Sequence, residues 1–513
     1  MTFMAGGFAL GLLLGCGGAP AIAQSTNRLS LEELRRIRLP DVAIESAQVV
    51  TPDRQKNPNA APYVEVKGIV GGTIRFELLL PENWNGRFAM GGGGGFVGSV
   101  QNSIRDCVNH GYATVGTDTG HEWQPGYMAG WARDNLEAQL NFGYLAVHRT
   151  AEVAKAILRG YYGADAAHSY FVGCSRGGGQ AMMESQRYPA DFDGIVAGAP
   201  AFDWTGIGAL MVQIAQVLYP DPARLDHPVL VKETLQKLQA AILEQSDARD
   251  GLKDGIIADP PAAGFDLSKV PDLTAEQRKA IDAIYNGARD AKGAISPGFT
   301  RGAECDPDQW IVWLVGPSPF LSKDHAPDLS FAFGTQVFKY FVFNNPDWDY
   351  SKYDFGSFEN DTRLAASFLN ATSPNLEAFR DRNGKLILWH GWADTALPAQ
   401  ATVDYYEKVL AHDPRAGNYC RLFMVPGCLH CGGGPGAAEV DWLSVIADWV
   451  ERGQAPERVV AARHNQGKLV LTRPLLPYPQ SAVYSGSGDP NDAASFVPKP
   501  GAKAVSRPHD PSP

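Results

Sequence analysis

A serine flanked by glycines is the first feature of the sequence that could carry out chemistry. Residues 173–177 read Gly-Cys-Ser-Arg-Gly, so Ser175 stands in a G-x-S-x-G pentapeptide. In this motif a tight turn between a strand and a helix projects the serine hydroxyl out of the sheet, where it can act as a nucleophile. The pentapeptide alone is weak evidence in a chain with 55 glycines, and a glycine-rich turn is the alternative.

Two further residues complete a possible catalytic triad. A serine of this kind is followed in sequence by an acid and then by a histidine. Asp394 closely follows the apolar run 385–390, and His430 closely follows the run 420–425. Both stand beyond the carboxyl ends of expected strands, which is where open α/β sheets place their sites. We predict Ser175 as the nucleophile, His430 as the general base and Asp394 as the residue that orients the base.

Two other histidines compete for the role of base. His390 ends the strand expected before Asp394, and we interpret it as a structural residue. His121, in the sequence T-D-T-G-H, could line a pocket but precedes the serine, which does not fit the required order.

The negative oxygen that forms during attack on a carbonyl needs backbone N–H donors. One donor comes from the residue after the nucleophile, which is Arg176. The second should come from the loop after an earlier strand, where a run of glycines occupies residues 91–95. We predict Gly92 as this donor, with Gly91 and Gly93 as alternatives. No G-K-S/T follows the run, so it is not a phosphate-binding loop, although a merely flexible loop remains possible.

Cysteines stand beside both the nucleophile and the base. Cys174 precedes Ser175 and Cys431 follows His430, so a triad would bring two thiols near the 4.4–6.8 Å Cα separation that disulfides require. Two buried thiols, or a redox pair of Cys428 and Cys431, are the alternatives. The pairing of the other cysteines beyond the N-terminal segment stays open: Cys107, Cys305, Cys420 and Cys428.

Short apolar runs typical of buried strands position these residues. Helical patterns at 135–158 and 178–188 lie between them. Strands that alternate with helices indicate an α/β fold with a mostly parallel sheet covered on both faces. The expected strands are 74–80, 87–90, 112–116, 168–173, 194–198, 385–390 and 420–425.

The alternation is interrupted between residues 202 and 372. This stretch contains an amphipathic helix, an Asp-rich loop and a segment dense in aromatic residues. We therefore predict a lid domain over 202–372, inserted into a catalytic domain formed by 24–201 and 373–500. Residues 501–513, rich in Pro and Ser, are expected to form an extended tail.

The N-terminus has features of an export signal. The apolar run 8–15 is too short to span a bilayer, and Ala-Ile-Ala at 21–23 resembles a cleavage site, so we predict a signal peptide over 1–23. Alternatively, Leu-Leu-Gly-Cys at 13–16 resembles a lipobox, which would make Cys16 a lipid anchor. We expect a secreted or periplasmic protein with no transmembrane segment.

The formal net charge of −11 bears on the partners of the protein. It provides no basic field that would attract nucleic acid, so a small-molecule substrate is the expected partner. The sequence leaves the oligomeric state open.

Taken together, these motifs resemble those of a known family. The pairs Cys174-Ser175 and His430-Cys431, with Asp394 between them in sequence, match the C-S…D…H-C pattern of the tannase and feruloyl esterase family. Further matches include L-P-E-N-W-N-G-R-F, D-G-I-V-A-G-A-P and F-R-D-R-N-G-K-L-I-L-W-H-G, and the resemblance covers most of residues 60–500. It implies an α/β-hydrolase core with a lid and hydrolysis of esters of aromatic acids, of the hydroxycinnamic or gallic type.

The same resemblance implies a calcium site in the lid, which we expect to stabilise it. Residues 247–256 read D-A-R-D-G-L-K-D-G-I, and hard oxygen ligands in a short loop suit Ca²⁺. A solvated acidic turn is the alternative. The implied ligands are the side chains of Asp247, Asp250 and Asp254 and the carbonyls of Leu252 and Ile256.

Several functions remain open at this point. The family also includes the hydrolase of mono(2-hydroxyethyl) terephthalate, but no arginine of the expected lid is obviously placed to bind a free carboxylate. The aromatic segment 331–350 is expected to contribute mainly to the core of the lid. A calcium-dependent binding module would not need an ordered Ser-Asp-His set, and a thiol-disulfide oxidoreductase would not need Ser175.

Overall fold

The computed structural model describes residues 28–499, except 54, 56–59, 124–128, 307–308, 319–320 and 322–325. The predicted signal peptide 1–23, the alternative anchor Cys16 and the predicted tail 501–513 lie outside the described residues. Within the described part of the chain, no helix is long and apolar enough to cross a membrane.

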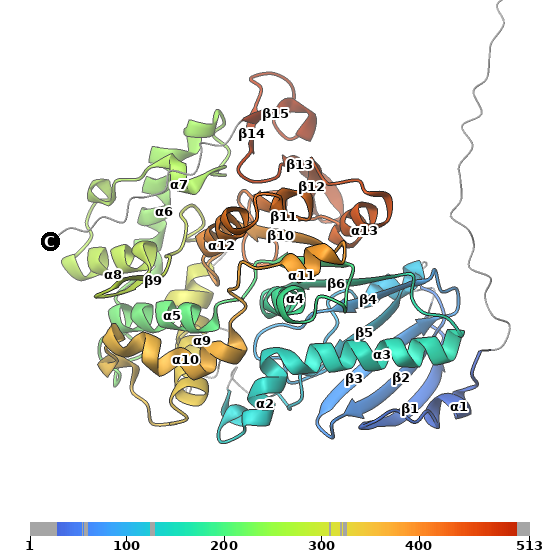
Figure 1. Cartoon of the computed structure of the whole chain (residues 1–513). Coiled ribbons are helices and arrows are strands. Elements are labelled where there is room, and N and C mark those ends of the chain that lie inside the picture. The colour runs from blue at the N-terminus through green and yellow to red at the C-terminus, as the bar shows by residue number, and fades with distance from the viewer. Residues whose placement is uncertain are drawn as a thin grey trace, which may run out of the picture.

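A nine-stranded mixed sheet runs through the molecule in the order β1-β2-β3-β5-β4-β6-β7-β10-β11 (Figure 1). From β5 to β11 neighbouring strands are parallel, whereas β1, β2, β3 and β5 pair antiparallel. The bounds are β1 Val42–Val50, β2 Tyr63–Val70, β3 Ile74–Pro81, β4 Arg87–Gly91, β5 Ala113–Thr117, β6 His168–Cys174, β7 Gly194–Gly198, β10 Lys385–Gly391 and β11 Cys420–Val425.

The strands expected from apolar runs are all present, and their ends differ by at most one residue from the expected ones. Strands β1 and β2 are not among those predicted from the sequence. The burial of β1 alternates and leaves much of the strand exposed, and β2 carries Glu65 and Lys67. Strands with one solvated face do not form continuous apolar runs, which explains the omission.

Helices cover both faces of the sheet. On one face α3 (Ala146–Tyr162), α4 (Arg176–Arg187) and α12 (Ala399–His412) pack against side chains such as Phe171. On the other face α13 (Trp442–Arg452) packs against the neighbouring strand residue Tyr170. Because successive strand residues point to opposite faces, an apolar strand buried on both sides is the expected result.

Between β7 and β10 the described residues add no strand to the nine-stranded sheet. Residues 204–369, called the helical region below, lie beside the sheet and enclose a separate apolar core (Figure 1). The lid predicted over 202–372 falls on this region, and its role as a lid stays a prediction. Its main elements are α5 Trp204–Leu218, α6 Lys232–Ser246, α8 Ala275–Asn286, β8 Ala288–Asp290, β9 Gly293–Ser296, η7 Ile311–Val315, α9 Leu329–Gln336, η8 Val337–Val342 and α10 Phe358–Leu369.

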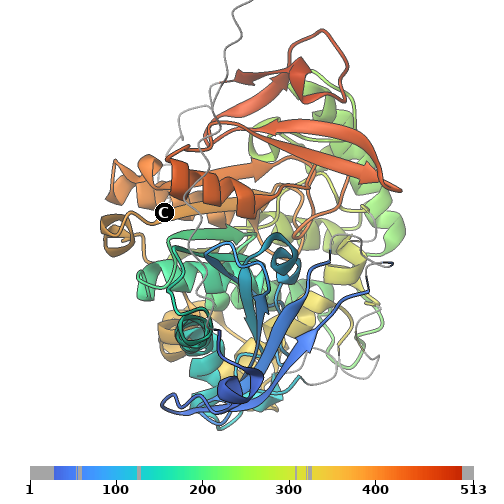
Figure 2. The same cartoon turned by 90° about the vertical axis from the view of Figure 1, so that its right-hand side faces the viewer.

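Two hairpins follow α13 and lie beyond the β11 edge of the sheet (Figures 1 and 2). They are formed by β12 (Val459–Asn465) with β13 (Lys468–Leu475), and by β14 (Ser481–Tyr484) with β15 (Phe496–Lys499). Arg473 of β13 donates a hydrogen bond from Nη2 to Oδ2 of Asp254, at 2.9 Å. The C-terminal part of the chain thereby contacts the acidic loop of the helical region.

Candidate active site

Ser175 occupies a sharp turn between β6 and α4. Its φ of 63° and ψ of −123° are strained for a residue with a side chain, and such strain persists only where surrounding bonds hold it. The Ser175 N–H donates to the carbonyl of Gly198 at 3.0 Å, and its own carbonyl accepts from the N–H of Ala201 at 2.9 Å. A Cβ atom on Gly173 would lie 2.4 Å from the carbonyl oxygen of Gly177, so glycine is required there.

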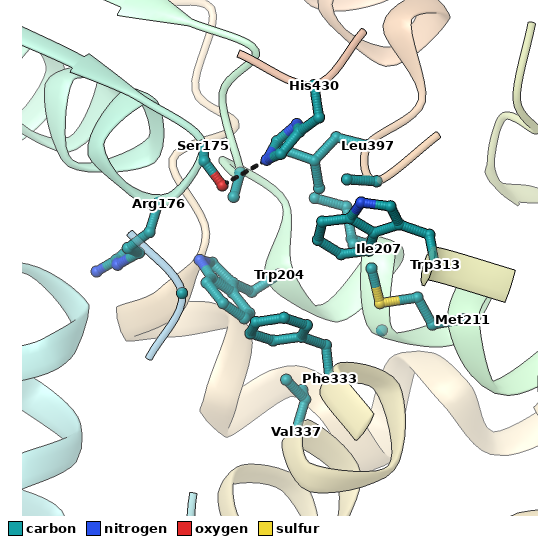
Figure 3. A pocket seen from close by; sticks show the side chains of 14 residues that line it. Ser175, Arg176, Trp204, Ile207, Met211, Trp313, Phe333, Val337, Leu397 and His430 are labelled. Carbon is teal, nitrogen blue, oxygen red and sulfur yellow. Dashed lines mark hydrogen bonds between the residues drawn. The ribbon is translucent and has the colours of Figure 1, made fainter. Parts of the chain in front are cut away.

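Ser175, His430 and Asp394 form a continuous hydrogen-bonded chain. Oγ of Ser175 lies 2.9 Å from Nε2 of His430, and Nδ1 of His430 lies 2.8 Å from Oδ2 of Asp394 (Figure 3 shows the first of these bonds). With the proton on Nδ1, the imidazole donates to the carboxylate and leaves Nε2 to accept from the serine hydroxyl. Three loops at the carboxyl ends of β6, β10 and β11 supply these side chains, because parallel strands end at the same edge of the sheet.

The carboxylate of Asp394 is fully buried and densely hydrogen-bonded. Oδ1 accepts from the N–H groups of Ala396 and Leu397, at 2.8 and 3.0 Å. Burial by itself would raise the pKa of Asp394, but the charge of His430 and hydrogen bonds from His390 and His430 outweigh it and hold the pKa below its usual range. The carboxylate is therefore ionised where it faces the imidazole.

His390 takes part in this network. Its Nε2 lies 3.2 Å from Oδ2 of Asp394, and its Nδ1 lies 2.7 Å from Oγ1 of Thr402. From the sequence, His390 was interpreted as a structural residue. Its position four residues before Asp394 was the available signal, but only the loop conformation turns both side chains toward each other.

His121 lies outside the wall of the pocket described below. Its Nε2 lies 2.7 Å from the carbonyl oxygen of Phe96, and its ring stacks on Trp131 at 3.5 Å between centroids. Burial lowers the pKa of His121 to about 4. These contacts give it a packing role.

The disulfide predicted between the catalytic loops is present. Cys174 and Cys431 are bonded, with their Cα atoms 5.9 Å apart and 257 positions apart in sequence. Cys428 remains a thiol, and its Sγ–H donates to the carbonyl of Leu429 at 3.2 Å. Burial raises the pKa of Cys428 well above its usual value, so the alternative redox pair with Cys431 does not describe this site.

The hydrogen bonds within the glycine run 91–95 do not support Gly92 as an oxyanion donor. The Gly92 N–H donates to the carbonyl of Val172 at 3.0 Å, and the Gly93 N–H donates to Oε1 of Gln180 at 3.1 Å. Both groups are therefore already engaged. Gly95 lines the pocket instead, and no described residue accepts a hydrogen bond from its N–H. The structure thus moves the candidate donor from Gly92 to Gly95.

Arg176 follows the nucleophile and begins α4, so its backbone N–H has no partner within the helix. Its side chain is buried and turns away from Ser175 (Figure 3). Nη2 donates to the carbonyls of Phe142 and Gly143, and the guanidinium lies 4.3 Å from the Phe142 ring centroid. Burial lowers the pKa of Arg176 to about 9. The side chain thus packs behind the site, while the N–H stays at the reaction centre.

A pocket opens beside Ser175 and His430 (Figure 3), and the empty space in it and at its mouth, open solvent included, is about 420 Å³. The Trp313 ring lies 5.4 Å from the His430 ring at 75° and 6.1 Å from the Phe333 ring at 19°. Of the aromatic segment 331–350, Phe333 and Val337 reach the pocket, whereas Phe331 and Phe338 are buried in the core. The other described lining residues are Gly95, Arg176, Ala201, Trp204, Ile207, Gly208, Met211, Ala396 and Leu397.

The loop expected to bind calcium has its carboxylates bonded to its own backbone. Both Oδ atoms of Asp247 accept from the Gly255 N–H at 3.1 Å, and Asp250 accepts from Leu252 and Ala258 at 3.0 and 3.1 Å. Oδ1 of Asp254 accepts from the Ile256 N–H at 3.1 Å. Among the described residues, no group of three or more His, Cys, Asp or Glu side chains is placed to hold a metal ion.

The chemistry of this donor set nevertheless suits Ca²⁺. Each ionised carboxylate has about four lone-pair sites, so an oxygen that accepts one N–H bond can still bind a cation. Burial raises the pKa of Asp247 and Asp250, and the charges of neighbouring carboxylates add to the effect. The calcium site stays a prediction.

A serine, histidine and aspartate arranged in this way at the carboxyl edge of a mostly parallel sheet define the α/β-hydrolase class. Comparisons with known proteins identify the family. The sequence profile described as tannase and feruloyl esterase matches residues 64–498. The chain therefore belongs to this family and is a carboxylic ester hydrolase, which confirms the predicted family and fold class.

Individual relatives agree with this assignment. The mono(2-hydroxyethyl) terephthalate hydrolase of Piscinibacter sakaiensis is 36% identical over 495 residues, which cover 83% of this chain and 81% of the relative. A probable feruloyl esterase of Arthroderma benhamiae is 32% identical over 450 residues, covering 82% and 81%. The crystal structure of feruloyl esterase B from Aspergillus oryzae has a TM-score of 0.78 and covers 92% of this chain and 100% of that one; at 24% identity it shows the fold.

Proposed function

We propose that the protein hydrolyses esters of aromatic carboxylic acids through a covalent acyl-enzyme on Ser175. The observation that carries this proposal is the hydrogen-bonded chain from Ser175 through His430 to Asp394, which faces a pocket walled by aromatic and aliphatic side chains. The relatives named feruloyl esterase and mono(2-hydroxyethyl) terephthalate hydrolase support an aromatic acyl group.

In the acylation step, Oγ of Ser175 attacks the carbonyl carbon while Nε2 of His430 takes the hydroxyl proton. Asp394 holds the imidazole in position and stabilises the positive charge that forms on it. Collapse of the tetrahedral intermediate breaks the ester C–O bond, and His430 returns the proton to the leaving alcohol. The acyl group is then bonded to Ser175.

Deacylation repeats these roles with water. His430 takes a proton from a water molecule, whose oxygen attacks the acyl carbon. The second tetrahedral intermediate releases the carboxylic acid, and the proton on His430 returns to Oγ of Ser175. No other co-reactant is needed.

Backbone N–H groups stabilise the negative oxygen in both steps. Arg176 supplies one, since it follows the nucleophile at the start of α4, where the helix dipole also favours negative charge. Gly95 supplies the second, in place of Gly92, because its N–H has no acceptor among the described residues and it borders the pocket.

The test compares wild type with Ser175→Ala on methyl ferulate and p-nitrophenyl butyrate. We expect a loss of roughly 10⁴–10⁶ in kcat. Rapid quenching followed by mass spectrometry should find the acyl group on the Ser175 peptide of wild type. Ser185→Ala, the same change in α4, is the control, since Ser185 is buried and bonded to the carbonyl of Met182. A Ser175→Ala variant with a tenth of wild-type activity would refute the mechanism.

We further propose that the loop 247–256 binds Ca²⁺ and stabilises the helical region. The ligands would be the carboxylates of Asp247, Asp250 and Asp254, with the carbonyls of Leu252 and Ile256. The support is the burial of Asp247 together with the mutual repulsion of the carboxylates. The ion has no role in the reaction steps above.

We propose that the protein is exported to the periplasm or the medium. It is supported by the apolar run 8–15, by the Ala-Ile-Ala sequence at 21–23 and by a disulfide that reducing compartments disfavour. N-terminal sequencing of the protein recovered outside the cytoplasm should find Gln24 as the first residue. A lipid-modified Cys16 would instead favour the anchored form, and a retained Met1 would contradict both.

A further inference from the structure

The wall of the pocket beside Ser175 is apolar over most of its extent. Four elements of the helical region supply it: α5 contributes Ile207 and Met211, η7 contributes Trp313, α9 contributes Phe333, and η8 contributes Val337. Leu397, from the loop after Asp394, closes the wall next to the catalytic histidine (Figure 3). A planar acyl group can therefore pack between rings and aliphatic side chains from several directions.

Charged partners for a substrate are missing from this wall, as far as the structure describes it. Arg176 is the one lining residue with a permanent charge, and its guanidinium points away from the pocket toward the carbonyls of Phe142 and Gly143 (Figure 3). A carboxylate that entered the pocket would lose its water without gaining a cation. Ring hydroxyls would likewise lose hydrogen bonds to water without finding acceptors in the wall.

Trp204 adds an unpaired donor to this apolar wall. The residue is 6% exposed, and its Nε1–H is buried without a partner among the described residues. Figure 3 shows the indole nitrogen at the edge of the ring that faces Ser175. A buried donor without an acceptor is unfavourable, so a ligand oxygen that reaches this nitrogen, after a small shift of the side chains that cover it, gains a hydrogen bond that water does not supply.

We propose that the pocket binds an uncharged aromatic acyl group by apolar contact, while Trp204 donates a hydrogen bond from Nε1 to an oxygen of the ester group. The inference rests on the proposed function, because it concerns the acyl group of the same reaction. The inference predicts a preference among aromatic esters. Neutral, weakly polar esters are favoured over esters with a free carboxylate or several ring hydroxyls. Trp204 thus contacts the substrate next to the reacting carbon.

Matched methyl esters test the acyl group. Dimethyl terephthalate and monomethyl terephthalate share a ring and differ in one charge; methyl benzoate and methyl gallate differ in three hydroxyls. After correction for the rate of each ester with hydroxide, kcat/KM should be about 100-fold or more higher for the dimethyl than for the monomethyl ester. It should be about 10-fold or more higher for the benzoate than for the gallate. Equal or reversed rates in either pair would overturn the inference.

The panel also separates this failure from a failure of the proposed function. If wild type hydrolyses all four esters at similar rates, and Ser175→Ala hydrolyses none, the mechanism stands and the selectivity is wrong. If wild type shows no activity above Ser175→Ala on any aromatic ester, the proposed function itself is wrong.

Trp204→Phe tests the hydrogen bond, since it removes the N–H and keeps an aromatic ring. We expect kcat/KM to fall about 10-fold on all four esters alike, because the acceptor belongs to the ester group. Trp310→Phe is the matched control: Trp310 is fully buried, its Nε1 also has no partner among the described residues, and it does not line the pocket. Full activity of Trp204→Phe, or an equal loss in Trp310→Phe, would refute the role of Trp204.

Discussion

Two sites in this molecule, the single buried carboxylate of the active site and the three carboxylates of the loop 247–256, differ in how their negative charge is compensated. In the active site, Asp394 accepts hydrogen bonds from His390 and His430 as well as from two backbone N–H groups, and its pKa lies below the usual range. In the loop 247–256, burial and neighbouring carboxylates raise the pKa of Asp247 and Asp250. Only the third carboxylate of this loop, Asp254, forms an ion pair with a described residue, Arg473.

The difference indicates what balances the negative charge at each of the two sites. Side chains of the chain itself balance the charge of the active site, so the loss of one of them should act mainly on the chemistry. The acidic loop leaves part of its charge unbalanced, so the addition or removal of an external cation should act mainly on stability.

The largest effect on activity is expected from loss of His430, which is both the catalytic base and a partner that compensates the charge of Asp394. His430→Ala should lower kcat by roughly 10⁴–10⁶, and Asp394→Asn by about 10⁴, because the residues of a triad act as a unit. Ester hydrolysis at saturating substrate measures both. His464→Ala, which breaks an exposed contact with Glu439, is the control and should retain full activity.

Asp394→Asn also gives a pH dependence. Folding lowers the pKa of the Asp394 carboxylate. Its ionised form therefore stabilises the fold fully at pH values above the pKa of an unfolded aspartate, about 4. This stabilisation is lost as the pH falls from there through the lower pKa of the folded state. Denaturant unfolding should therefore show a larger difference between wild type and variant at pH 7 than at pH 3. A difference that grows in acid would show that Asp394 is not held ionised by its partners.

The disulfide holds the two loops that carry the nucleophile and the base. Cys174→Ser with Cys431→Ser should lower kcat by about 10²-fold with less change in KM, because a displacement of about 1 Å can have that effect. Cys428→Ser should keep nearly full activity, since that thiol is not paired. Peptide mapping without reduction checks the bond. Active enzyme with free thiols at Cys174 and Cys431 would contradict its role in positioning.

A smaller effect is expected at His390, the second partner of Asp394. His390→Gln should lower kcat about 10-fold with little change in KM, and should move the acidic limb of the pH–rate profile to higher pH, because Asp394 is then less compensated. Thr402→Val should follow in the same direction, whereas Thr402→Ser keeps the hydroxyl that contacts His390 and should behave as wild type. A uniform loss of stability with an unchanged pH profile would indicate a packing role alone.

The smallest effect on activity, but a clear one on stability, is expected at the acidic loop. Removal of Ca²⁺ by EDTA should lower the Tm by roughly 2–5 °C, and added Ca²⁺ should restore it, as linkage requires for a ligand of the folded state. Asp250→Asn should make the Tm insensitive to both. Asp266→Asn, a change outside the loop in the same region, should leave the response intact. If protein shown to be free of metal has the same Tm as Ca²⁺-loaded protein, the loop does not bind Ca²⁺.

The contrast between the two sites also shows which features of a site the sequence can predict. The Cys174–Cys431 disulfide was predicted from adjacency to Ser175 and His430, because residues next to two touching side chains can lie close enough to be bridged. For the acidic loop, the spacing of Asp247, Asp250 and Asp254 identified candidate ligands but not where their oxygens point. Their hydrogen bonds to the loop backbone depend on the turn geometry, which the residue types alone do not specify.

The sequence by itself determined the strands of the parallel half of the sheet, the turn at Ser175 and the order of Ser175, Asp394 and His430. These features depend on local patterns: apolar runs set the strands, and parallel strands bring their carboxyl ends to one edge. The tertiary structure alone decided which glycine N–H is free, because Val172 and Gln180 come from distant segments to engage Gly92 and Gly93.

The tertiary structure likewise decided that His390 shares Asp394 with the base, and that Trp204, Trp313 and Phe333 meet beside Ser175. The contacts beside Ser175 join positions up to about 160 residues apart, and they arise from the packing of the helical region against the edge of the sheet. A short sequence pattern does not encode contacts of this kind, because they depend on the summed packing of many side chains rather than on the residues next to each position.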